Sequence, residues 1–530
     1  MIRKIIILFA IPLTCFAQIK KLSDPSIELP EFVITGVEHI TLPVVQKPKA
    51  ELVSILSKDF VRPAYSPEEL QISEISNPVQ KEATLRDSLR IFNGMIRLGA
   101  GIQTIPTAEI TFGKPFTSGL FWGKAWGKSE RQYEKNAGVS SAGIDVITSF
   151  FIGNNSDFLP GTKIQIGGNY NLESYNFYVP DTLYFKRNSQ LGNLHLNISS
   201  LMNESIKFDT KLNDDIFYLK DRNLNENLFS VGGFLQTGLK DFSIASVVMY
   251  KHQNVRYDSL SKMNNNFFYI NPFILLNISD LIKIRGGLTY AHSGSNNFFA
   301  PYGFAAIKFG DKLTLYGELN PKVSFLSISD LSQINRYYNP ANQQYIFLKE
   351  KMNAKAAFRY EYEKYFEIDV GMSFTDYDNY VYFTNEIRSG EFNLKTSAAK
   401  KFSGFFNFLF HTGPNGLFYG DLVVENIKDY FNYFIPYSPS LKSTLAYGYQ
   451  FKSGLRIDTK LYLASACYAD LLNTKKVNEF ADVGIRAEYE IYRDIRFYSE
   501  ISNLINHKNY YWSGYPEKPF DIIFGIDYRW

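Results

Sequence analysis

A regular alternation of apolar and polar residues over long segments restricts the fold of this chain more than any other feature of its sequence. In residues 519–530 apolar side chains occupy every second position, and Ile523 alone breaks the polar face. Residues 366–375 and 482–491 alternate in the same way. Because successive side chains of a β-strand point to opposite sides, these segments are predicted to be strands with one apolar and one polar face.

The length and composition of these segments favour a membrane barrel over a soluble β-sandwich, whose strands also alternate. Many segments reach about ten residues or more, whereas strands of globular proteins average about five or six. The chain contains 45 Phe and 37 Tyr, and they enrich the apolar faces as is typical of lipid-facing strands. A soluble all-β protein remains the alternative.

The predicted connections are short and long in turn. Tight turns are expected at 240–241, 279–280, 310–312, 452–454 and 493–494, and long polar loops at 253–264, 321–345 and 467–476. Short turns at one end and long loops at the other are typical of outer-membrane barrels. We therefore predict an all-β fold: a transmembrane outer-membrane β-barrel of antiparallel strands.

About 22 strands can be counted, and an even number places both ends of the barrel in the periplasm. They are expected near residues 92–104, 107–113, 117–127, 140–152, 161–174, 189–200, 204–217, 226–238, 241–254, 264–277, 280–292, 300–309, 312–320, 346–362, 365–377, 391–411, 416–428, 439–451, 454–467, 476–491, 494–505 and 519–530.

Two segments precede the predicted barrel at residues 92–530. Residues 1–17 combine a basic start, a short apolar run and a small residue, which predicts a signal peptide. Residues 18–91 contain seven of the 21 prolines, a density that favours an extended periplasmic segment over a sheet core. After residue 17 no apolar stretch approaches the roughly twenty residues of a spanning helix.

Charge and composition exclude several other functions. Without residues 1–17, which carry Arg3 and Lys4, 54 basic residues face 53 acidic ones, so nucleic acid is not an expected partner. The two cysteines and six scattered histidines show no metal-ligand spacing, and no nucleophile stands beside a histidine and an acid. We therefore expect no enzyme, no metal site and no cofactor.

The C-terminal residues carry a resemblance to a known family. The stretch NLINHKNYY at 503–511, then Gly514-Tyr515-Pro516 and a closing strand that ends at Trp530, resembles the C-terminus of TonB-dependent receptors. YDNYVYF at 377–383 is similar to a recurring strand of their barrels. The resemblance implies an outer-membrane barrel with a transport or receptor role. The closing aromatic strand resembles the signal read by the barrel-assembly machinery, here Phe524, Ile526, Tyr528 and Trp530.

A second, shorter resemblance lies near the N-terminus. It is similar to the TonB box and consists of Glu28, Leu29, Pro30, Glu31, Phe32, Val33, Ile34, Thr35 and Gly36. It implies that residues 18–91 bind TonB or another periplasmic protein by adding a strand to that partner's sheet. The alternatives are a sticky patch in a linker and a segment tucked into the barrel mouth.

The chain departs from the family in its N-terminal region. The family carries a globular plug of well over a hundred residues, whereas only 74 residues (91 − 17) separate signal and barrel here. We therefore expect a relative that lacks the plug. A structural scaffold of an envelope complex and a passive porin remain alternatives to transport.

Charged residues on the polar faces are expected to point into the lumen. They are Lys355, Arg359, Arg456, Asp458, Lys460, Arg486 and Glu488. They could line a substrate path, or they could pair across neighbouring strands of a hydrated wall. The Tyr- and Asn-rich residues 335–345 are expected in an external loop that binds a ligand or partner, or that lies at the membrane interface.

Overall fold

The computed structural model describes residues 93–530, apart from the short segments 154–159, 178–184, 201–205, 239–240, 258–260, 280, 311, 341–344, 363–365, 386–389 and 412–415. The predicted signal peptide and the extension at 18–91, with its TonB-box-like stretch, lie outside the described residues.

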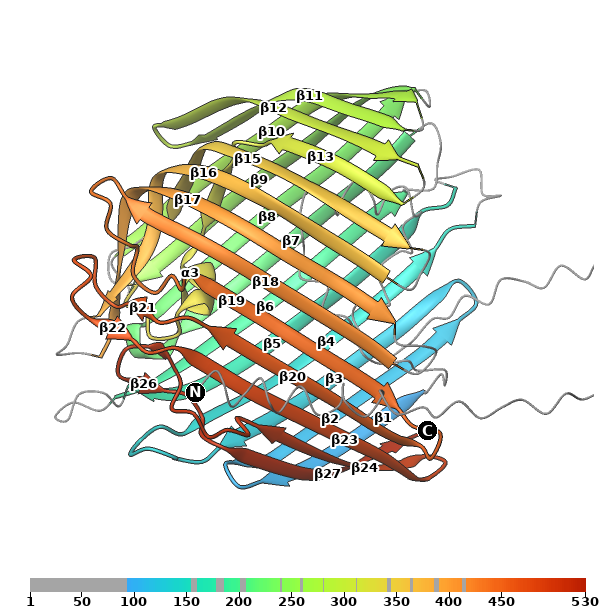
Figure 1. Cartoon of the computed structure of the whole chain (residues 1–530), viewed down its shortest axis with the longest axis vertical. Helices are drawn as coiled ribbons and strands as arrows, with labels where there is room; N and C mark the ends of the chain where they lie inside the picture. Colours follow the sequence, from blue (N-terminus) through green and yellow to red (C-terminus); the bar gives the residue numbers. More distant parts are fainter. Residues whose placement is uncertain are drawn as a thin grey trace, which may run out of the picture. The chain divides into compact units, whose positions relative to one another are not determined.

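Twenty-two strands close into one antiparallel barrel and cross it at a tilt (Figure 1). Each barrel strand pairs with the next one along the chain, and the last pairs with the first, with Arg529 opposite Met95. The predicted all-β barrel is therefore confirmed. Among the described residues no helix is long and apolar enough to cross a membrane.

The barrel strands are, in chain order, β1 (Gly94–Gly101), β2 (Thr104–Phe116), β3 (Gly119–Glu130), β4 (Val139–Phe151), β5 (Lys163–Phe177), β6 (Phe185–Ser200), β7 (Ile206–Leu219), β8 (Leu224–Gly238), β9 (Phe242–Tyr257), β10 (Ser261–Ser279), β11 (Ile282–Ser293), β12 (Asn296–Phe309), β13 (Leu313–Leu319), β15 (Ile346–Tyr362), β16 (Phe366–Asn385), β17 (Phe392–His411), β18 (Gly416–Asp429), β19 (Leu441–Gln450), β20 (Leu455–Ala464), β23 (Phe480–Tyr492), β24 (Ile495–Ser502) and β27 (Asp521–Arg529).

The other elements lie in the connections. They are a 3₁₀ turn η2 (Lys220–Arg222), β14 (Val323–Leu326), α3 (Ile328–Ile334), β21 (Cys467–Tyr468), β22 (Lys476–Val477), β25 (Tyr510–Trp512) and β26 (Tyr515–Pro516).

The two ends of the barrel differ in their connections. At the end where β1 begins and β27 finishes, many turns are short, such as 117–118 and 493–494; we call it the turn end. The long connections 320–345, 430–440, 465–479 and 503–520 all lie at the opposite end, the loop end. This is the asymmetry that the sequence predicts.

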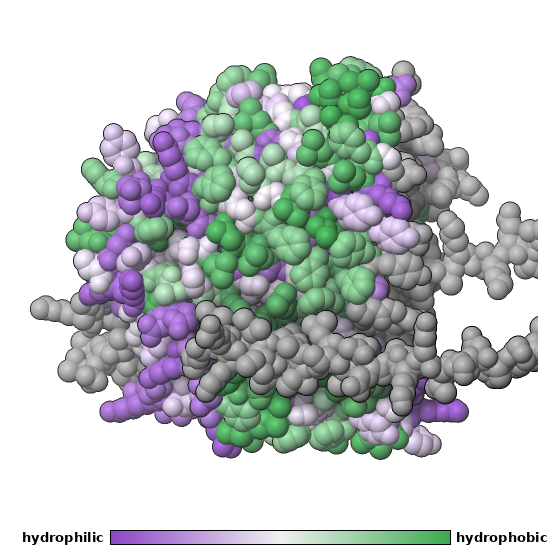
Figure 2. Space-filling model, in the orientation of Figure 1, coloured by the Kyte–Doolittle hydropathy of each residue, from purple (hydrophilic) through white to green (hydrophobic). Residues whose placement is uncertain are grey.

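The outer face of the barrel is apolar. On β27, Phe524 and Ile526 are 49% and 53% exposed, whereas Asp527 is fully buried. The predicted assembly-signal residues Phe524, Ile526, Tyr528 and Trp530 all point outward. Figure 2 shows hydrophobic residues over the outer faces of the strands and hydrophilic residues gathered on the side of the long loops.

Two predicted loops take other forms. The prediction of a long polar loop at 253–264 is wrong, because β9 runs to Tyr257 and β10 starts at Ser261. Polar residues there complete a regular ladder, in which Lys262 lies opposite Arg256, since a strand that extends into water needs no apolar face. Residues 335–340 were expected to be external, but Tyr338 is fully buried and Tyr337 nearly so.

The interior divides into two regions that lie on opposite sides of the barrel (Figure 1). Along β8–β15 the inward side chains pack against one another, with Phe273, Phe304 and Tyr316 at the centre of one cluster and Phe267 and Phe325 in another. We call this region the packed half. Along β1–β7 and β19–β27 the inward side chains surround open space, and we call this region the hollow half.

Candidate functional site

The connection between β13 and β15 folds into the barrel, and its residues 320–340 are here named the inward loop. Its helix α3 begins at Ser327, whose hydroxyl accepts a hydrogen bond from the Asp330 N–H at 3.1 Å. The Asp330 carboxylate accepts in return from the Ser327 N–H at 2.9 Å, which completes a capping box. Ile328 and Leu331 of this helix are fully buried against the wall.

A buried carboxylate fixes the start of α3 to the barrel wall. Glu226 on β8 is fully buried and accepts hydrogen bonds from the N–H groups of Ile328 at 3.0 Å and Ser329 at 2.7 Å. Gln253 on β9 donates to the same carboxylate. These donors are otherwise unpaired in the first turn of a helix, so Glu226 ties the inward loop to β8.

Arg187 on β6 ties down the other end of the inward loop. Its side chain is only 1% exposed, forms ion pairs with Asp221 at 3.0 Å and Glu391 at 3.1 Å, and donates to the Tyr338 carbonyl at 2.7 Å. Arg222 reaches Glu391 as well, at 2.5 Å. One buried guanidinium therefore links three separate connections at the loop end.

Aromatic packing and backbone hydrogen bonds join the inward loop to the last connection and to β17. The ring of Tyr337 stacks on Tyr515 of the last connection with centroids 3.6 Å apart. Backbone hydrogen bonds run from the Phe392 N–H to the Tyr337 carbonyl at 3.0 Å and from the Asn339 N–H to the Phe392 carbonyl at 2.8 Å. The resulting buried cluster takes residues from β5, β7, β8, β9, β16 and β17, so it bridges the loop end from one side to the other.

The last connection, 503–520, holds the residues of the C-terminal motif, and two of its asparagines fix the backbone. Asn503, at a φ of +48°, donates to the His507 carbonyl at 2.9 Å and accepts from the His507 N–H at 2.9 Å. Asn509 pairs with both backbone groups of Ala481, at 2.9 and 2.8 Å. These hydrogen bonds of the motif therefore fold the connection inward. Burial raises the pKa of Glu517 in the same connection.

A cavity of about 1170 Å³ lies in the hollow half, between the inward loop, the last connection and the strands. Aromatic side chains line it, among them Tyr133, Tyr175, Tyr337, Tyr437, Tyr462, Tyr498, Tyr511 and Trp512. Most of its charges are paired: Arg336 with Glu173 at 3.1 Å, for example, and Lys128 with Glu130 at 2.5 Å. The wall is thus polar and aromatic without a dominant sign of charge.

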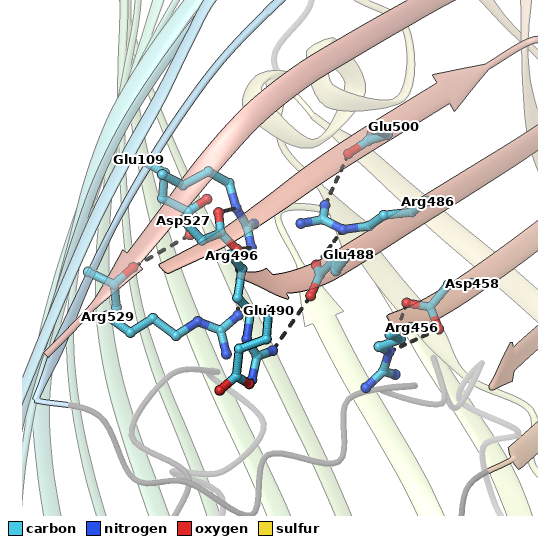
Figure 3. A network of polar contacts seen from close by, with 12 residues as sticks. Glu109, Arg456, Asp458, Arg486, Glu488, Glu490, Arg496, Glu500, Asp527 and Arg529 are labelled. Atoms are coloured by element: carbon cyan, nitrogen blue, oxygen red, sulfur yellow. Dashed lines mark hydrogen bonds and ion pairs between the residues drawn. The ribbon is translucent and has the colours of Figure 1, made fainter. Parts of the chain in front are cut away.

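An ion-pair network on β1, β2, β20, β23, β24 and β27 (Figure 3) reaches the cavity through Arg97, Glu109, Arg486 and Glu500. Arg97 binds Asp527 through two hydrogen bonds, of 2.6 and 2.9 Å, across the seam between β1 and β27. Arg486 pairs with Glu488 at 2.7 Å and with Glu500 at 3.0 Å. These pairs give this part of the lumen charges of both signs.

The predicted lumen charges fall into three places. Arg486 and Glu488 belong to the network of Figure 3, and Arg456 pairs with Asp458 beside them at 3.0 Å. Lys460 occupies the same face of β20 and is exposed. Across the barrel, Arg359 is buried against Asp369 at 3.2 Å, and the Lys355 ammonium lies 4.8 Å from the centre of the Phe405 ring.

The anchors of the inward loop were not anticipated from the sequence. Glu226 is a lone carboxylate in an otherwise ordinary strand, and nothing near it in the chain points to residues 328–329. Arg187 and Glu391 are 204 residues apart. The sequence of the inward loop itself could have indicated its burial, because Ile328, Leu331 and two tyrosines interrupt a polar stretch there.

These features define a class: a large antiparallel barrel whose loop end is bridged by an inward-folded connection above a polar cavity. Solved structures of TonB-dependent receptors with 22 strands share this barrel. The FrpB iron transporter of Neisseria meningitidis matches with a TM-score of 0.64 at 9% identity, over 83% of this chain and 82% of that one. The ferric-catecholate import receptor Fiu of E. coli K12 gives 0.62 at 10%, over 83% and 82%.

A third solved structure, the siderophore receptor PiuA of Acinetobacter baumannii, matches with a TM-score of 0.60 at 10% identity, over 83% of this chain and 82% of that one. No protein-family model and no curated protein sequence matches the chain. At such low identity the likeness is one of fold. Within the described segments, no group of three His, Cys, Asp or Glu residues could hold a metal ion.

Proposed function

We propose that this chain is an outer-membrane transporter or receptor that takes up or binds a polar solute in the hollow half of its barrel. The cavity of about 1170 Å³ carries the proposal, because it exceeds the usual 300–1,000 Å³ or so of small-molecule sites. The apolar outer face supports a place in the outer-membrane bilayer, with the turn end in the periplasm.

The lining of the cavity favours a solute without large net charge. Tyrosine and tryptophan rings offer apolar faces with polar edges, and most of the charged groups beside them already form ion pairs. A strongly charged solute would have to break such pairs. A neutral or zwitterionic solute with many hydrogen-bonding groups would not.

The inward loop supports the idea of a relative without the family's plug. It occupies the loop end of the lumen and is held there by Glu226 and Arg187. In this proposal, the inward loop covers the outer side of the cavity. Residues 18–91 reach a periplasmic partner, TonB or another protein, through the stretch from Glu28 to Gly36.

Two experiments test the transport proposal. Deletion of residues 28–36 should abolish energised uptake of the solute while the barrel still folds and inserts, and unchanged uptake would remove the role of this stretch.

Single-channel conductance should be recorded with and without residues 18–91. A closed full-length protein and an open truncated one would identify the extension as the stopper. Closure in both would assign that role to the inward loop.

A structural scaffold is the second candidate, and the packed half favours it. Side chains such as Phe304 and Tyr316 fill the lumen along β8–β15 and leave only part of it for a solute. A scaffold should co-purify a stoichiometric partner through residues 18–91 after gentle extraction. A solitary barrel with solute-dependent conductance would exclude it.

A further inference from the structure

Strands β9 and β10 are longer than a membrane requires, and the excess lies at the loop end. They have 16 and 19 residues, whereas a tilted strand crosses a bilayer in about 9–11. At the turn end, the outward side chains Phe242 on β9 and Leu276 on β10 are already apolar and exposed. The surplus residues therefore extend the outer face beyond the apolar band at the loop end.

The outward face of β9 changes from apolar to cationic along its length. Ile244 and Tyr250 are exposed within the apolar band, 54% and 38% respectively. The next outward positions are His252, Asn254 and Arg256, spaced two residues apart. This order matches the layers that a strand meets as it leaves a bilayer: acyl chains, the interfacial region, and charged headgroups.

Strand β10 supplies matching polar residues. Its outward positions beside those of β9 carry, in order towards the loop end, Asn266, Asn264 and Lys262. Lys262 lies directly opposite Arg256, and both are exposed. Neither forms an ion pair within the described part of the chain. The outward carboxylate of Asp214, two strands away on β7, accepts a hydrogen bond from Asn227 at 2.8 Å.

A hydrogen-bonded trio marks the interfacial level of this hairpin. The Tyr250 hydroxyl donates to Asn266 Oδ1 at 2.9 Å, and His252 Nδ1 lies 2.8 Å from the same oxygen. All three side chains are outward and solvent-accessible. No hydrogen bond among the described residues uses His252 Nε2 or the Asn266 Nδ2 group, so each is available to a ligand.

The next hairpin repeats the trio. On β11 and β12, the Tyr290 hydroxyl lies 3.4 Å and His292 Nδ1 2.7 Å from Asn297 Oδ1. His292 is also opposite Phe268 of β10, so the two trios are neighbours across four consecutive strands. The same three residue types in the same arrangement form one continuous outer surface, here named the rim.

We propose that the rim binds the phosphorylated sugar headgroup of a glycolipid in the outer leaflet. The apolar band below holds the acyl chains, the two histidines with Arg256 and Lys262 bind phosphate, and the asparagine amides and tyrosine hydroxyls contact sugar hydroxyls. The proposal rests on the outer-membrane location given under Proposed function. It is independent of the solute and of residues 18–91.

The test uses the full-length protein in detergent and measures bound lipid by native mass spectrometry. The probes are bisphosphorylated lipid A, the same lipid without phosphates, and phosphatidylethanolamine. The combined variant H252A/R256Q/K262Q/H292A should bind bisphosphorylated lipid A about tenfold or more weakly than the unaltered protein. The phosphate-free lipid should bind weakly to both proteins.

A matched control lies on a different hairpin of the outer face. Tyr170 on β5 is exposed and donates to Gln190 on β6 at 2.8 Å, without a histidine or cation in the arrangement. Tyr170→Phe should leave lipid A binding unchanged. Heat-modifiable migration of all proteins on a gel verifies that each barrel is folded.

Three outcomes would overturn the proposal. The first is equal binding of lipid A by the combined variant, and the second is equal binding of phosphorylated and phosphate-free lipid by the unaltered protein. The third is complete displacement by millimolar inorganic phosphate, which would identify a site for free anions. Fractionation of the same variant with the outer membrane, and its solute uptake, test the proposed function separately.

Discussion

The packed half and the hollow half of this barrel are built from the same alternating strands but enclose different interiors. In the packed half, inward positions carry Phe273, Phe304 and Tyr316, and these side chains bury one another. In the hollow half, inward positions carry paired charges such as Arg486 and Glu500 around a cavity. One pattern of alternation thus supports a packed core on one side and a charged surface around a cavity on the other.

Truncation of a side chain in each half gives the largest contrast. Phe304→Ala should lower the free energy of unfolding by about 3–5 kcal/mol, because it leaves a void among buried rings. Tyr462→Ala, which enlarges a cavity that already exists, should cost about 1 kcal/mol. Chemical denaturation of the barrel in lipid vesicles measures both. Equal losses would mean that the hollow half is as tightly packed as the other.

Removal of the buried guanidinium should open the hollow half from the loop end. Arg187→Ala leaves Asp221 and Glu391 without their common partner and should cost about 3 kcal/mol. It should also raise single-channel conductance, because the Tyr338 carbonyl loses its anchor.

The matched control is Arg222→Ala, since Arg222 binds the same Glu391 but is 37% exposed. Its cost should stay below about 1 kcal/mol, with unchanged conductance. If the two variants conduct alike, the inward loop does not depend on the buried guanidinium.

Glu226 on β8, which anchors the inward loop, lies where the packed half meets that loop. Glu226→Leu leaves the N–H groups of Ile328 and Ser329 without an acceptor in a buried place, at a cost of about 2–3 kcal/mol. Glu226→Gln retains one acceptor oxygen and should cost less. Hydrogen exchange of residues 328–334 reports the effect, and unchanged protection in the leucine variant would show that packing alone holds the helix.

A smaller, pH-dependent effect is expected beside the hollow half, in the connection 465–479. Partial burial raises the pKa of Asp470, but hydrogen bonds from the Lys475 N–H (2.6 Å) and from Thr474 outweigh it and hold the pKa below its ordinary value. The stabilisation is therefore complete above the ordinary value of about 4 and is lost as pH falls through the lowered pKa.

Proteolysis of this connection should accelerate in the unaltered protein only as the pH falls below about 4. Asp470→Asn should remove most of that pH dependence. The same acceleration in the variant would assign the effect to another group.

Alternation predicted the barrel because every strand needs an apolar outer face, and residues 519–530 show that face almost without exception. The strand ends were harder to place. Arg256 and Lys262 were predicted to lie in a loop, although they pair within a ladder, because polar outward residues are acceptable where a strand extends into water. The ion pair between Arg187 and Glu391 could not be predicted from the local sequence either, since that contact depends on the closed barrel.

The seam between β1 and β27 has a consequence for the order in which the barrel is completed. Arg97 and Asp527 are 430 residues apart, and the Asn93 N–H donates to the carbonyl of the final residue, Trp530, at 2.7 Å. At Gly94 even a methyl group would collide with the Trp530 ring. Until β27 has joined the ring, β1 therefore keeps an unpaired edge, which is a template for wrong pairing. That edge must therefore stay protected until the ring closes, although the closed barrel shows no open edge.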